Sequence, residues 1–444
     1  METTSTTYPA PDGVPASSRY AVTVDGQPSF TYLTTGPAEA EFTAGHTSSW
    51  TSFDLRGRCE VRIRRLGRPI SQAVVRPLAS SVQAEVDRGE VVLRLDQPGK
   101  LCLECDGDLT DVLFLFANEP ESEIPSPDDP RVVWWGPGVH EIGKFYALQP
   151  GLTYYLAPGA FLKGSFAGGG DGTRILGRGV LSGAAYKWPG HLQEGSPERV
   201  DLVNLAGDGL ELSGVTLVDS PYYVVVAGGR DNCFRDLKVL AWHFNTDGLS
   251  SGPGARIDDC FLRVADDALK PSVSDTRITR CVVWADRAAA FQLSWNSLED
   301  SGGSVVRDCD VIHHMPFCTV ADEWTGSVFS SWHGGTAHLH DLLFEDIRIE
   351  GRCARLINVF MQRNLWSQQE GEWGRFSRLC FRKISAEQPF RFPSRLLGHD
   401  ADHLIDDVLF EDLRIAGRTI HSPEELGLET NEYVRGLRFA TTET

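Results

Sequence analysis

Two acidic motifs stand out in the middle of the chain. The first is NTDG at residues 245–248, and the second, DDALK at residues 266–270, begins 19 residues after Asp247. Acidic side chains are rarely buried without partners, so three that meet at one place need a reason. Carboxyl groups held close together can supply both a proton donor and an activator of water, which is the chemistry of glycosidic bond cleavage. Asp247, Asp266 and Asp267 are therefore candidate catalytic residues.

A repeated phrase of branched apolar residues surrounds these motifs. Copies begin at residues 214, 236, 260, 281 and 309, and looser copies begin at 346, 383 and 412. Irregular spacings of this size, carried by β-branched residues with no helical period, are typical of a solenoid of stacked β coils. Long amphipathic helices between the copies would indicate leucine-rich or βαβ repeats, and the sequence shows none.

The second short strand of each coil can be aligned with the same strand in the next coil. In this alignment Asp247 lies above Asp267, and Lys270 lies above Gln292. Adjacent strands are ~4.8 Å apart, so the two carboxylates are predicted to be near neighbours. Like charges this close raise the pKa of at least one group, so that it keeps its proton near neutral pH. Lys270 either moderates this repulsion or binds a sugar hydroxyl.

Two other uses of these carboxylates stay open. A pair of aspartates is common in turns, and Asp258-Asp259 lies just before a repeat copy, where a turn explains it. Asp266-Asp267 differs because it shares a register with Asp247. Clustered carboxylates on β solenoids also bind calcium. The histidines between 243 and 340 follow no ligand spacing, so no metal site and no cofactor are predicted.

Aromatic and planar polar side chains gather in the same part of the sequence. The flat C–H faces of sugars stack on aromatic rings, and their hydroxyls pair with amides and charged groups. A single tryptophan is more often a packing residue, so the clustering is what favours a carbohydrate cleft. The predicted substrate-binding residues are Lys270, Gln292, Trp295, His243, Trp242 and Trp324.

The part of the chain before the repeats has a different pattern. From about residue 18 to 119, short runs of alternating polarity are separated by glycine, proline and aspartate. This pattern is typical of antiparallel strands in a β-sandwich. A polar, proline-rich stretch at 118–127 indicates a linker. The sequence therefore predicts an all-β protein, with an N-terminal β-sandwich domain over 1–125 that has a flexible start, and a β-helix catalytic domain over 126–444.

The composition of the chain limits the classes of molecule that the protein is expected to bind. The 444 residues carry a formal net charge of −19, which disfavours nucleic acid and anionic membranes as partners. The N-terminus shows no signal peptide pattern, and the apolar runs are too short to span a bilayer, so a cytoplasmic location is expected. Of the ten cysteines, Cys260, Cys281 and Cys309 fall in one register and predict an internal ladder of thiols. Cys102 and Cys105 form a lone C-x-x-C that favours packed thiols over zinc. A homo-oligomer is left open.

The acidic motifs resemble those of glycoside hydrolases built on right-handed parallel β-helices. NTDG at 245–248 followed by Asp266-Asp267 is shared in outline with the polygalacturonases of family 28. DDALK at 266–270, with FQLSW at 291–295 in the next coil, is similar to family 49, the dextranases and isopullulanases. That family also carries an N-terminal β-sandwich before its β-helix.

The resemblance implies a role for each aspartate. Asp266 matches the general acid that protonates the departing oxygen, while Asp247 and Asp267 match the pair that activates water. It implies an inverting hydrolase that needs no cofactor and cleaves α-linked neutral oligosaccharides or glucans. The Gly-His-Gly and Arg-x-Lys motifs of polygalacturonases are missing after Asp267, which disfavours a galacturonide. A family-28-like galacturonidase, a polysaccharide lyase and a non-catalytic carbohydrate-binding solenoid stay open as alternatives.

Overall fold

The computed structural model describes residues 4–190, 195–318, 326–364, 367 and 371–442. Strands dominate this part of the chain, and its α-helix α1 (Pro423–Leu426) is one turn long. No helix among the described residues is long and apolar enough to cross a membrane. The all-β class predicted from the repeats and the alternating runs is confirmed.

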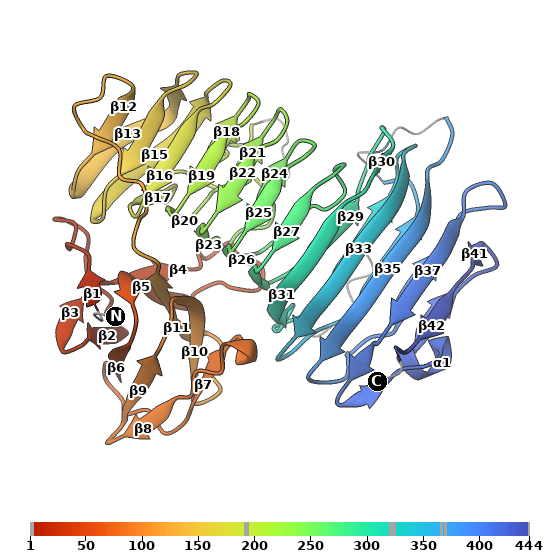
Figure 1. Ribbon diagram of the computed structural model, residues 1–444, viewed down its shortest axis with the longest axis horizontal. Coiled ribbons are helices and arrows are strands. Elements are labelled where there is room, and N and C mark those ends of the chain that lie inside the picture. Colours follow the sequence, from red (N-terminus) through yellow and green to blue (C-terminus); the bar gives the residue numbers. More distant parts are fainter. Residues whose placement is uncertain (1–3, 191–194, 319–325, 365–366, 368–370, 443–444) are drawn as a thin grey trace.

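The N-terminal domain is a sandwich of two sheets (Figure 1). The alternating runs predicted as strands form β2, β6, β9 and β11, and their inward apolar residues make one core between the sheets. Neighbouring strands are antiparallel except β5 and β11, which run parallel, so the prediction of a purely antiparallel sandwich needs this correction. One sheet contains β1 (Thr4–Thr7), β4 (Thr31–Thr35), β5 (Thr47–Arg56), β7 (Ala73–Arg76), β10 (Gly99–Cys105) and β11 (Asp111–Asn118); the other contains β2 (Tyr20–Val24), β3 (Gln27–Ser29), β6 (Cys59–Arg65), β8 (Glu85–Asp87) and β9 (Glu90–Leu95).

The rest of the chain coils into a parallel β-helix with three stacks of strands (Figure 1). The last sandwich strand ends at Asn118 and the first coil strand begins at Val132, so the predicted boundary at 125–126 falls between them. The first stack contains β12 (Val132–Trp135), β14 (Thr153–Leu156), β16 (Arg174–Gly177), β19 (Glu211–Ser213), β22 (Cys233–Arg235), β25 (Arg256–Asp258) and β27 (Arg277–Thr279).

The second stack lies beside the first, and later strands are long enough to belong to both. It contains β13 (Gly138–Leu148), β15 (Ala160–Gly168), β17 (Val180–Ser182), β20 (Thr216–Val218), β23 (Lys238–Leu240), β26 (Phe261–Val264) and β28 (Val282–Ala285). The long strands are β31 (Val305–His314), β33 (His338–Ile349), β35 (Arg375–Ala386) and β37 (Ile405–Glu411).

The third stack positions the acidic motifs. It contains β18 (Val203–Leu205), β21 (Val225–Ala227), β24 (Leu249–Ser251), β29 (Phe291–Ser294), β32 (Phe329–His333), β34 (Ile357–Met361), β36 (Ser394–Leu397) and β40 (Leu428–Thr430). Single parallel bridges from Leu249 to Leu269 and from Leu269 to Phe291 carry the register across the coil between β24 and β29.

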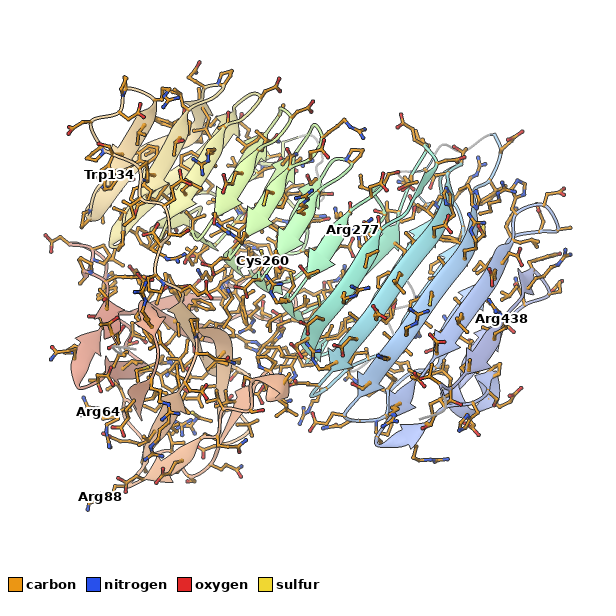
Figure 2. The ribbon with its side chains drawn as sticks, viewed as in Figure 1. Arg64, Arg88, Trp134, Cys260, Arg277 and Arg438 are labelled. Carbon is orange, nitrogen blue, oxygen red and sulfur yellow. The ribbon has the colours of Figure 1, made fainter. Side chains whose placement is uncertain are left out.

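The interior of the β-helix is filled by aliphatic and aromatic side chains from every coil. The predicted thiol ladder is part of this core, since Cys260, Cys281 and Cys309 are fully buried. Figure 2 labels Cys260 in the stack, and Arg277 and Arg438, which are exposed, on its outer surface. Cys102 and Cys105 are both buried but contribute to two different core clusters, so this C-x-x-C does not form a thiol pair.

The sandwich packs against the second stack through an aromatic interface. Trp50, Phe114 and Phe116 from β5 and β11 join Phe261 and Trp284 in one buried cluster. Burial of apolar surface on this scale stabilises the contact between the domains, because each large aromatic side chain removes ~150–250 Å² from water. The two domains therefore share a core.

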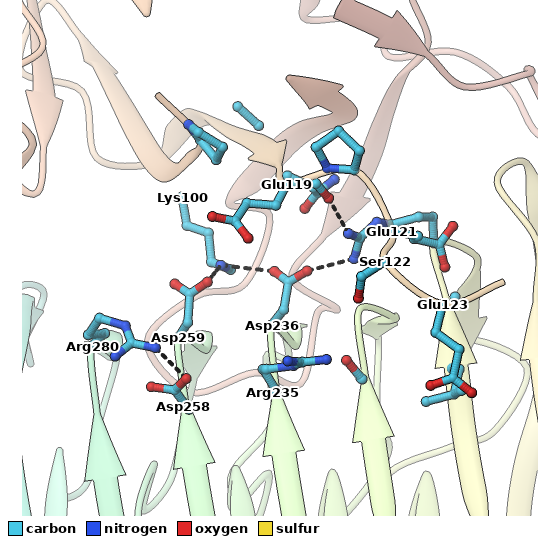
Figure 3. A pocket seen from close by; sticks show the side chains of 18 of the residues that line it. Lys100, Glu119, Glu121, Ser122, Glu123, Arg235, Asp236, Asp258, Asp259 and Arg280 are labelled. Carbon is cyan, nitrogen blue, oxygen red and sulfur yellow. Dashed lines mark hydrogen bonds and ion pairs between the residues drawn. The ribbon is translucent and has the colours of Figure 1, made fainter. Parts of the chain in front are cut away.

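A second, charged part of the interface lies beside the linker (Figure 3). It borders a cavity of about 430 Å³ whose walls come from the sandwich, the linker and the first coils. Lys100 Nζ lies 2.9 Å from Asp236 and 2.7 Å from Asp259, and Arg178 Nη1 donates to Asp236 at 2.6 Å. Burial alone would raise the pKa of Asp236, but the charges of Lys238, Lys100 and Arg178 hold that pKa below its ordinary value. None of the three candidate catalytic aspartates lines this cavity.

Candidate active site

The predicted alignment of the acidic motifs is confirmed. Leu249, Leu269 and Phe291 are bridged on successive coils, so the residues two positions earlier, Asp247, Asp267 and Ala289, also follow one another along the stack. The backbone ladder continues through the motifs: Gly248 N–H donates to the Asp267 carbonyl and Ala268 N–H to the Ala289 carbonyl, each at 2.9 Å. Parallel pairing therefore fixes the distance between the carboxylates.

The three carboxyl groups converge at the corner where the second and third stacks meet. One oxygen from each of Asp247, Asp266 and Asp267 lies within 4.8 Å of the other two. Their exposed fractions are 4%, 7% and 5%, respectively. Three acids this close and this well shielded from bulk water cannot all be ionised at low cost, so the cluster holds at least one proton.

Asp266 is held by two backbone donors. Asn245 N–H donates to its Oδ2 at 2.8 Å, and Asp267 N–H donates to its Oδ1 at 2.9 Å. Asn245 has a φ of 65°, in the left-handed region that asparagine tolerates better than most residues. Burial raises the pKa of Asp266 well above its ordinary value, and the charges of Asp247 and Asp267 raise it further. Asp266 is therefore the carboxyl group best suited to donate a proton.

Asp267 receives a different set of contacts. Ala289 N–H donates to its Oδ1 at 3.1 Å, and the Gln292 side-chain amide donates to its Oδ2. Burial and the charge of Asp247 raise the pKa of Asp267 to about 7, although Lys270 and both hydrogen bonds act in the opposite direction. The predicted residue Gln292 is thus part of the cluster, and it orients a candidate catalytic carboxylate.

Lys270 neutralises the third carboxylate. Its Nζ lies 2.6 Å from Asp247 Oδ2 and 4.9 Å from the centre of the Tyr223 ring. Burial alone would lower the pKa of Lys270, but the charges of Asp247, Tyr223 and Asp267 and the hydrogen bond to Asp247 together outweigh burial and raise that pKa above its ordinary value. Of the two uses expected for Lys270, the structure supports moderation of the repulsion among the aspartates.

Gly248 allows the coils to stack closely at the motif. A Cβ atom at this position would lie 2.4 Å from the Ala268 carbonyl oxygen and 2.7 Å from Leu262 Cδ2. Real Cβ atoms do not approach backbone oxygens this closely, so a larger residue would separate the two rungs that carry the carboxylates. The glycine of NTDG is required for packing and not for turn conformation.

The structure gives a different outcome for each of the other four predicted substrate-binding residues. Trp295 follows β29 and is partly exposed, with its ring 5.2 Å from that of Trp332. His243 is buried against Trp188, and its carbonyl accepts a 2.6 Å hydrogen bond from Thr246 Oγ1, so it supports the turn before Asp247. Trp324 lies outside the described residues.

The prediction for Trp242 is corrected by the structure. Trp242 is only 2% exposed, and its Nε1 donates to Thr34 Oγ1 of the sandwich at 2.9 Å. The guanidinium of Arg263 lies 4.5 Å from its ring. Trp242 therefore belongs to the domain interface, because the sandwich covers the face of the coil to which this side chain points.

Two residues beside the aspartates were not among the predicted substrate-binding residues. Tyr223 lies one rung before Asp247, since Val225 pairs with Leu249, and the register could have revealed it. Arg287 forms an ion pair with Glu41 of the sandwich at 3.0 Å and stacks on Phe244 at 4.2 Å. Its positive charge opposes the rise in the Asp266 pKa. No sequence pattern connects Glu41 with Arg287, which lies in the other domain.

The donor set does not favour a closed cation cage. In the described part of the chain, these three aspartates are the one group of histidine, cysteine or acidic residues close enough to share a metal ion. Calcium prefers six to eight oxygen ligands. Here Asn245, Asp267, Ala289, Gln292 and Lys270 already donate to the carboxylate oxygens.

Comparisons with known proteins agree with the motifs. No family model matches the chain. It is 25% identical over 420 residues to a dextranase of Arthrobacter globiformis, covering 73% of this chain and 65% of that protein. It is 26% identical over 382 residues to the isopullulanase of Aspergillus niger, covering 70% of this chain and 68% of that protein. The chain thus spans just under two thirds of the length of the Arthrobacter relative.

A solved structure matches the whole architecture. Dex49A from Penicillium minioluteum superimposes with a TM-score of 0.74 at 17% sequence identity, covering 98% of this chain and 96% of that chain. This match shows that the two chains share a fold, in which a β-sandwich precedes a right-handed parallel β-helix. The resemblance to the dextranases and isopullulanases, first drawn from the acidic motifs, is confirmed.

Proposed function

We propose that this protein is an inverting glycoside hydrolase that cleaves α-linked neutral oligosaccharides or glucans. The observation that carries the proposal is the convergence of Asp247, Asp266 and Asp267, with oxygens within 4.8 Å, on neighbouring rungs of the β-helix. The relatives named dextranase and isopullulanase support an α-glucan as substrate.

In the proposed mechanism Asp266 gives its proton to the glycosidic oxygen while the bond from that oxygen to the anomeric carbon breaks. A water molecule attacks the anomeric carbon from the opposite side, and its proton passes to the Asp247–Asp267 pair. The raised pKa of Asp266 keeps the donor protonated. The ammonium group of Lys270 pairs with Asp247 Oδ2 at 2.6 Å and so balances negative charge on the pair that accepts the proton. No cofactor takes part.

The stereochemical outcome rests on the resemblance and not on distance. Inverting enzymes commonly separate their two carboxyl groups by ~6.5–9.5 Å, whereas retaining enzymes separate them by ~5–5.5 Å. The oxygens here are closer than either range. The contacts of Asp267 favour a base over a nucleophile, because both of its oxygens accept hydrogen bonds from Ala289 and Gln292.

A lyase is disfavoured by the protonation of its candidate bases. Elimination needs a group that removes a proton from a sugar carbon, and Lys270 and Tyr223 are the basic and phenolic groups nearest the aspartates. The pKa of Lys270 is raised by Asp247, and the pKa of Tyr223 is raised by Asp247 and by burial. Both groups therefore keep their protons near neutral pH.

Cytoplasmic location and self-association stay predictions.

The proposal is tested with a panel of α-1,6-, α-1,4- and α-1,3-linked gluco-oligosaccharides together with polygalacturonate. We expect new reducing ends from at least one α-glucan, none from polygalacturonate, and no product that absorbs in the near ultraviolet. Cleavage of polygalacturonate alone would establish the galacturonidase alternative. Binding of a glucan without cleavage would establish a carbohydrate-binding solenoid.

A further inference from the structure

A line of functional side chains continues from the aspartates toward the N-terminal coils. Val203 pairs with Val225, and Val225 pairs with Leu249, so Asp201, Tyr223 and Asp247 occupy equivalent positions on three successive rungs. Rungs are ~4.8 Å apart, which is close to the length of one sugar unit. The side chains around Asp201 and Tyr223 are therefore placed to meet the unit next to the cleaved bond.

Asp201 organises two polar side chains in this region. Its two oxygens accept from Arg199 Nε at 2.9 Å and from Arg199 Nη2 at 3.1 Å. Oδ2 also accepts from Asn204 Nδ2 at 2.8 Å. Asp201 is itself only 5% exposed, whereas Arg199 and Asn204 are exposed. The buried carboxylate thus fixes the orientation of a guanidinium and an amide that both face solvent.

Arg199 also lies against an aromatic pair. Its Cζ is 4.3 Å from the ring centre of Tyr222 and 4.6 Å from that of Tyr223. The two rings are 5.1 Å apart and nearly parallel, with an interplanar angle of 18°. Cation–π contact and the bidentate ion pair together leave the guanidinium little freedom to move.

The hydrogen-bonding groups that this cluster leaves unused are suited to a sugar. Among the described residues, Arg199 Nη1 and Asn204 Oδ1 make no hydrogen bond within the protein, so a donor and an acceptor are left on two side chains that share Asp201 Oδ2. Vicinal hydroxyls of a pyranose both donate and accept, and the ring presents a C–H face to an aromatic side chain.

Charge pairing selects a neutral sugar over a uronate. The charge of Arg199 is balanced by Asp201, and the charge of Lys270 is balanced by Asp247. A carboxylate-bearing sugar would meet no uncompensated cation in this cluster and would come close to two fixed carboxylates. Like charges at such distances are unfavourable, even when solvent screens them in part.

We propose that Arg199, Asn204 and Tyr223 form a subsite for one neutral sugar unit beside the point of cleavage. Asp201 is a positioning residue, which orients the subsite without touching the sugar. This inference rests on the proposed function, since the subsite would bind the α-glucan cleaved by the aspartates.

The first test compares Asn204→Ala and Arg199→Ala with the control Arg256→Ala, an exposed residue of β25 on another face. For the α-glucan that the wild type cleaves best, kcat/KM should fall about 5-fold in Asn204→Ala and about 30-fold in Arg199→Ala, with the control unchanged. Unchanged kcat/KM in both subsite variants would overturn the proposal while leaving the hydrolase function intact.

The second test uses Asp201→Asn. If Asp201 had only a structural role, this variant would not change the preference between neutral and acidic sugars. Removal of this negative charge leaves the Arg199 cation uncompensated, so relative affinity should shift toward an oligosaccharide that carries a glucuronate unit. The shift is measured without turnover by calorimetric titration of the neutral and the acidic oligosaccharide. The two proteins compared are the Asp266→Asn variant and the double variant that carries both Asp266→Asn and Asp201→Asn. We expect at least a 5-fold change in the affinity ratio, and an unchanged ratio would overturn the subsite.

The titration also separates the two proposals. If the wild type cleaves no α-glucan, the hydrolase proposal fails, but neutral oligosaccharide binding that is lost in Asn204→Ala still supports the subsite. If glucans are cleaved and binding is unaffected by Asn204→Ala and Arg199→Ala, the subsite alone is wrong.

Discussion

Lys270 Nζ lies 2.6 Å from Asp247 Oδ2, so one of the three clustered carboxylates is neutralised by an ammonium group from the next rung. This ion pair gives Asp247 an electrostatic environment that differs from those of Asp266 and Asp267. The negative charge of Asp247 raises the pKa values of Asp266 and Asp267. In the proposed mechanism, the raised pKa keeps Asp266 protonated as the donor, beside the carboxylate that pairs with Lys270.

Asp266→Asn should abolish proton donation with little change in stability. We expect kcat on a natural glucan to fall about 10³-fold or more, because general acid catalysis contributes ~10²–10⁴-fold. Initial rates from reducing-end release measure the loss, and a thermal melt checks folding. Asp258→Asn is the matched control, since Asp258 is the last residue of β25 and pairs with Arg280 away from the three aspartates. Equal activity of the two variants would remove Asp266 from the mechanism.

Lys270→Met should move the acidic limb of the pH–rate profile to higher pH. The charge of Lys270 lowers the pKa of Asp267, which stands at about 7, so its removal raises that pKa further. The base then becomes ionised only at higher pH. Lys270→Arg keeps the charge and should leave the limb near its wild-type position. A limb that moves equally in both variants would mean that the charge of Lys270 does not control the base.

Gly248→Ala should destabilise the protein by about 2 kcal/mol, because its Cβ would lie 2.4 Å from the Ala268 carbonyl oxygen. Activity should fall as well, since the clash separates the rungs that carry Asp247 and Asp267. Gly136→Ala is the control, because the nearest atom to its Cβ would be 3.9 Å away. Denaturant unfolding of both variants provides the comparison, and equal stability would show that the coils can relax at Gly248.

Arg263→Met should weaken the contact between the domains. Arg263 and Asp286 are both fully buried with a separation of 3.1 Å, and Arg263 Nη1 donates to Ser48 Oγ of the sandwich at 2.7 Å. Loss of one partner from a buried ion pair costs about 3–5 kcal/mol. Arg94→Met breaks an exposed pair with Glu85 and should lower the stability far less. Thermal melts that shift equally would contradict the buried role of Arg263.

The catalytic register could be predicted because the coil repeats itself. Leu249, Leu269 and Phe291 are inward residues in a recurring pattern, and aligning them places Asp247 on Asp267 without any knowledge of the coordinates. The fold class followed from the same pattern. The short strand β18 carries no clear copy of the repeat, so the place of Asp201 beside Tyr223 was not recognised.

Contacts between the domains could not be predicted from the sequence. Trp242 meets Thr34 across 208 positions of the chain, and Arg287 meets Glu41 from the same sandwich domain. Periodicity shows which residues point out of a coil but not which outward face another domain covers. The sequence therefore predicts Trp242 in a sugar-binding cleft, whereas in the structure the sandwich covers this side chain.

The most direct test of the account is the anomeric form of the first product. Hydrolysis of the best α-linked oligosaccharide is followed by proton NMR from the first minute, before mutarotation brings the anomers to equilibrium. We expect that the β-anomer appears first in the wild type and that Asp266→Asn releases none. Initial release of the α-anomer would contradict direct attack by water held by Asp247 and Asp267.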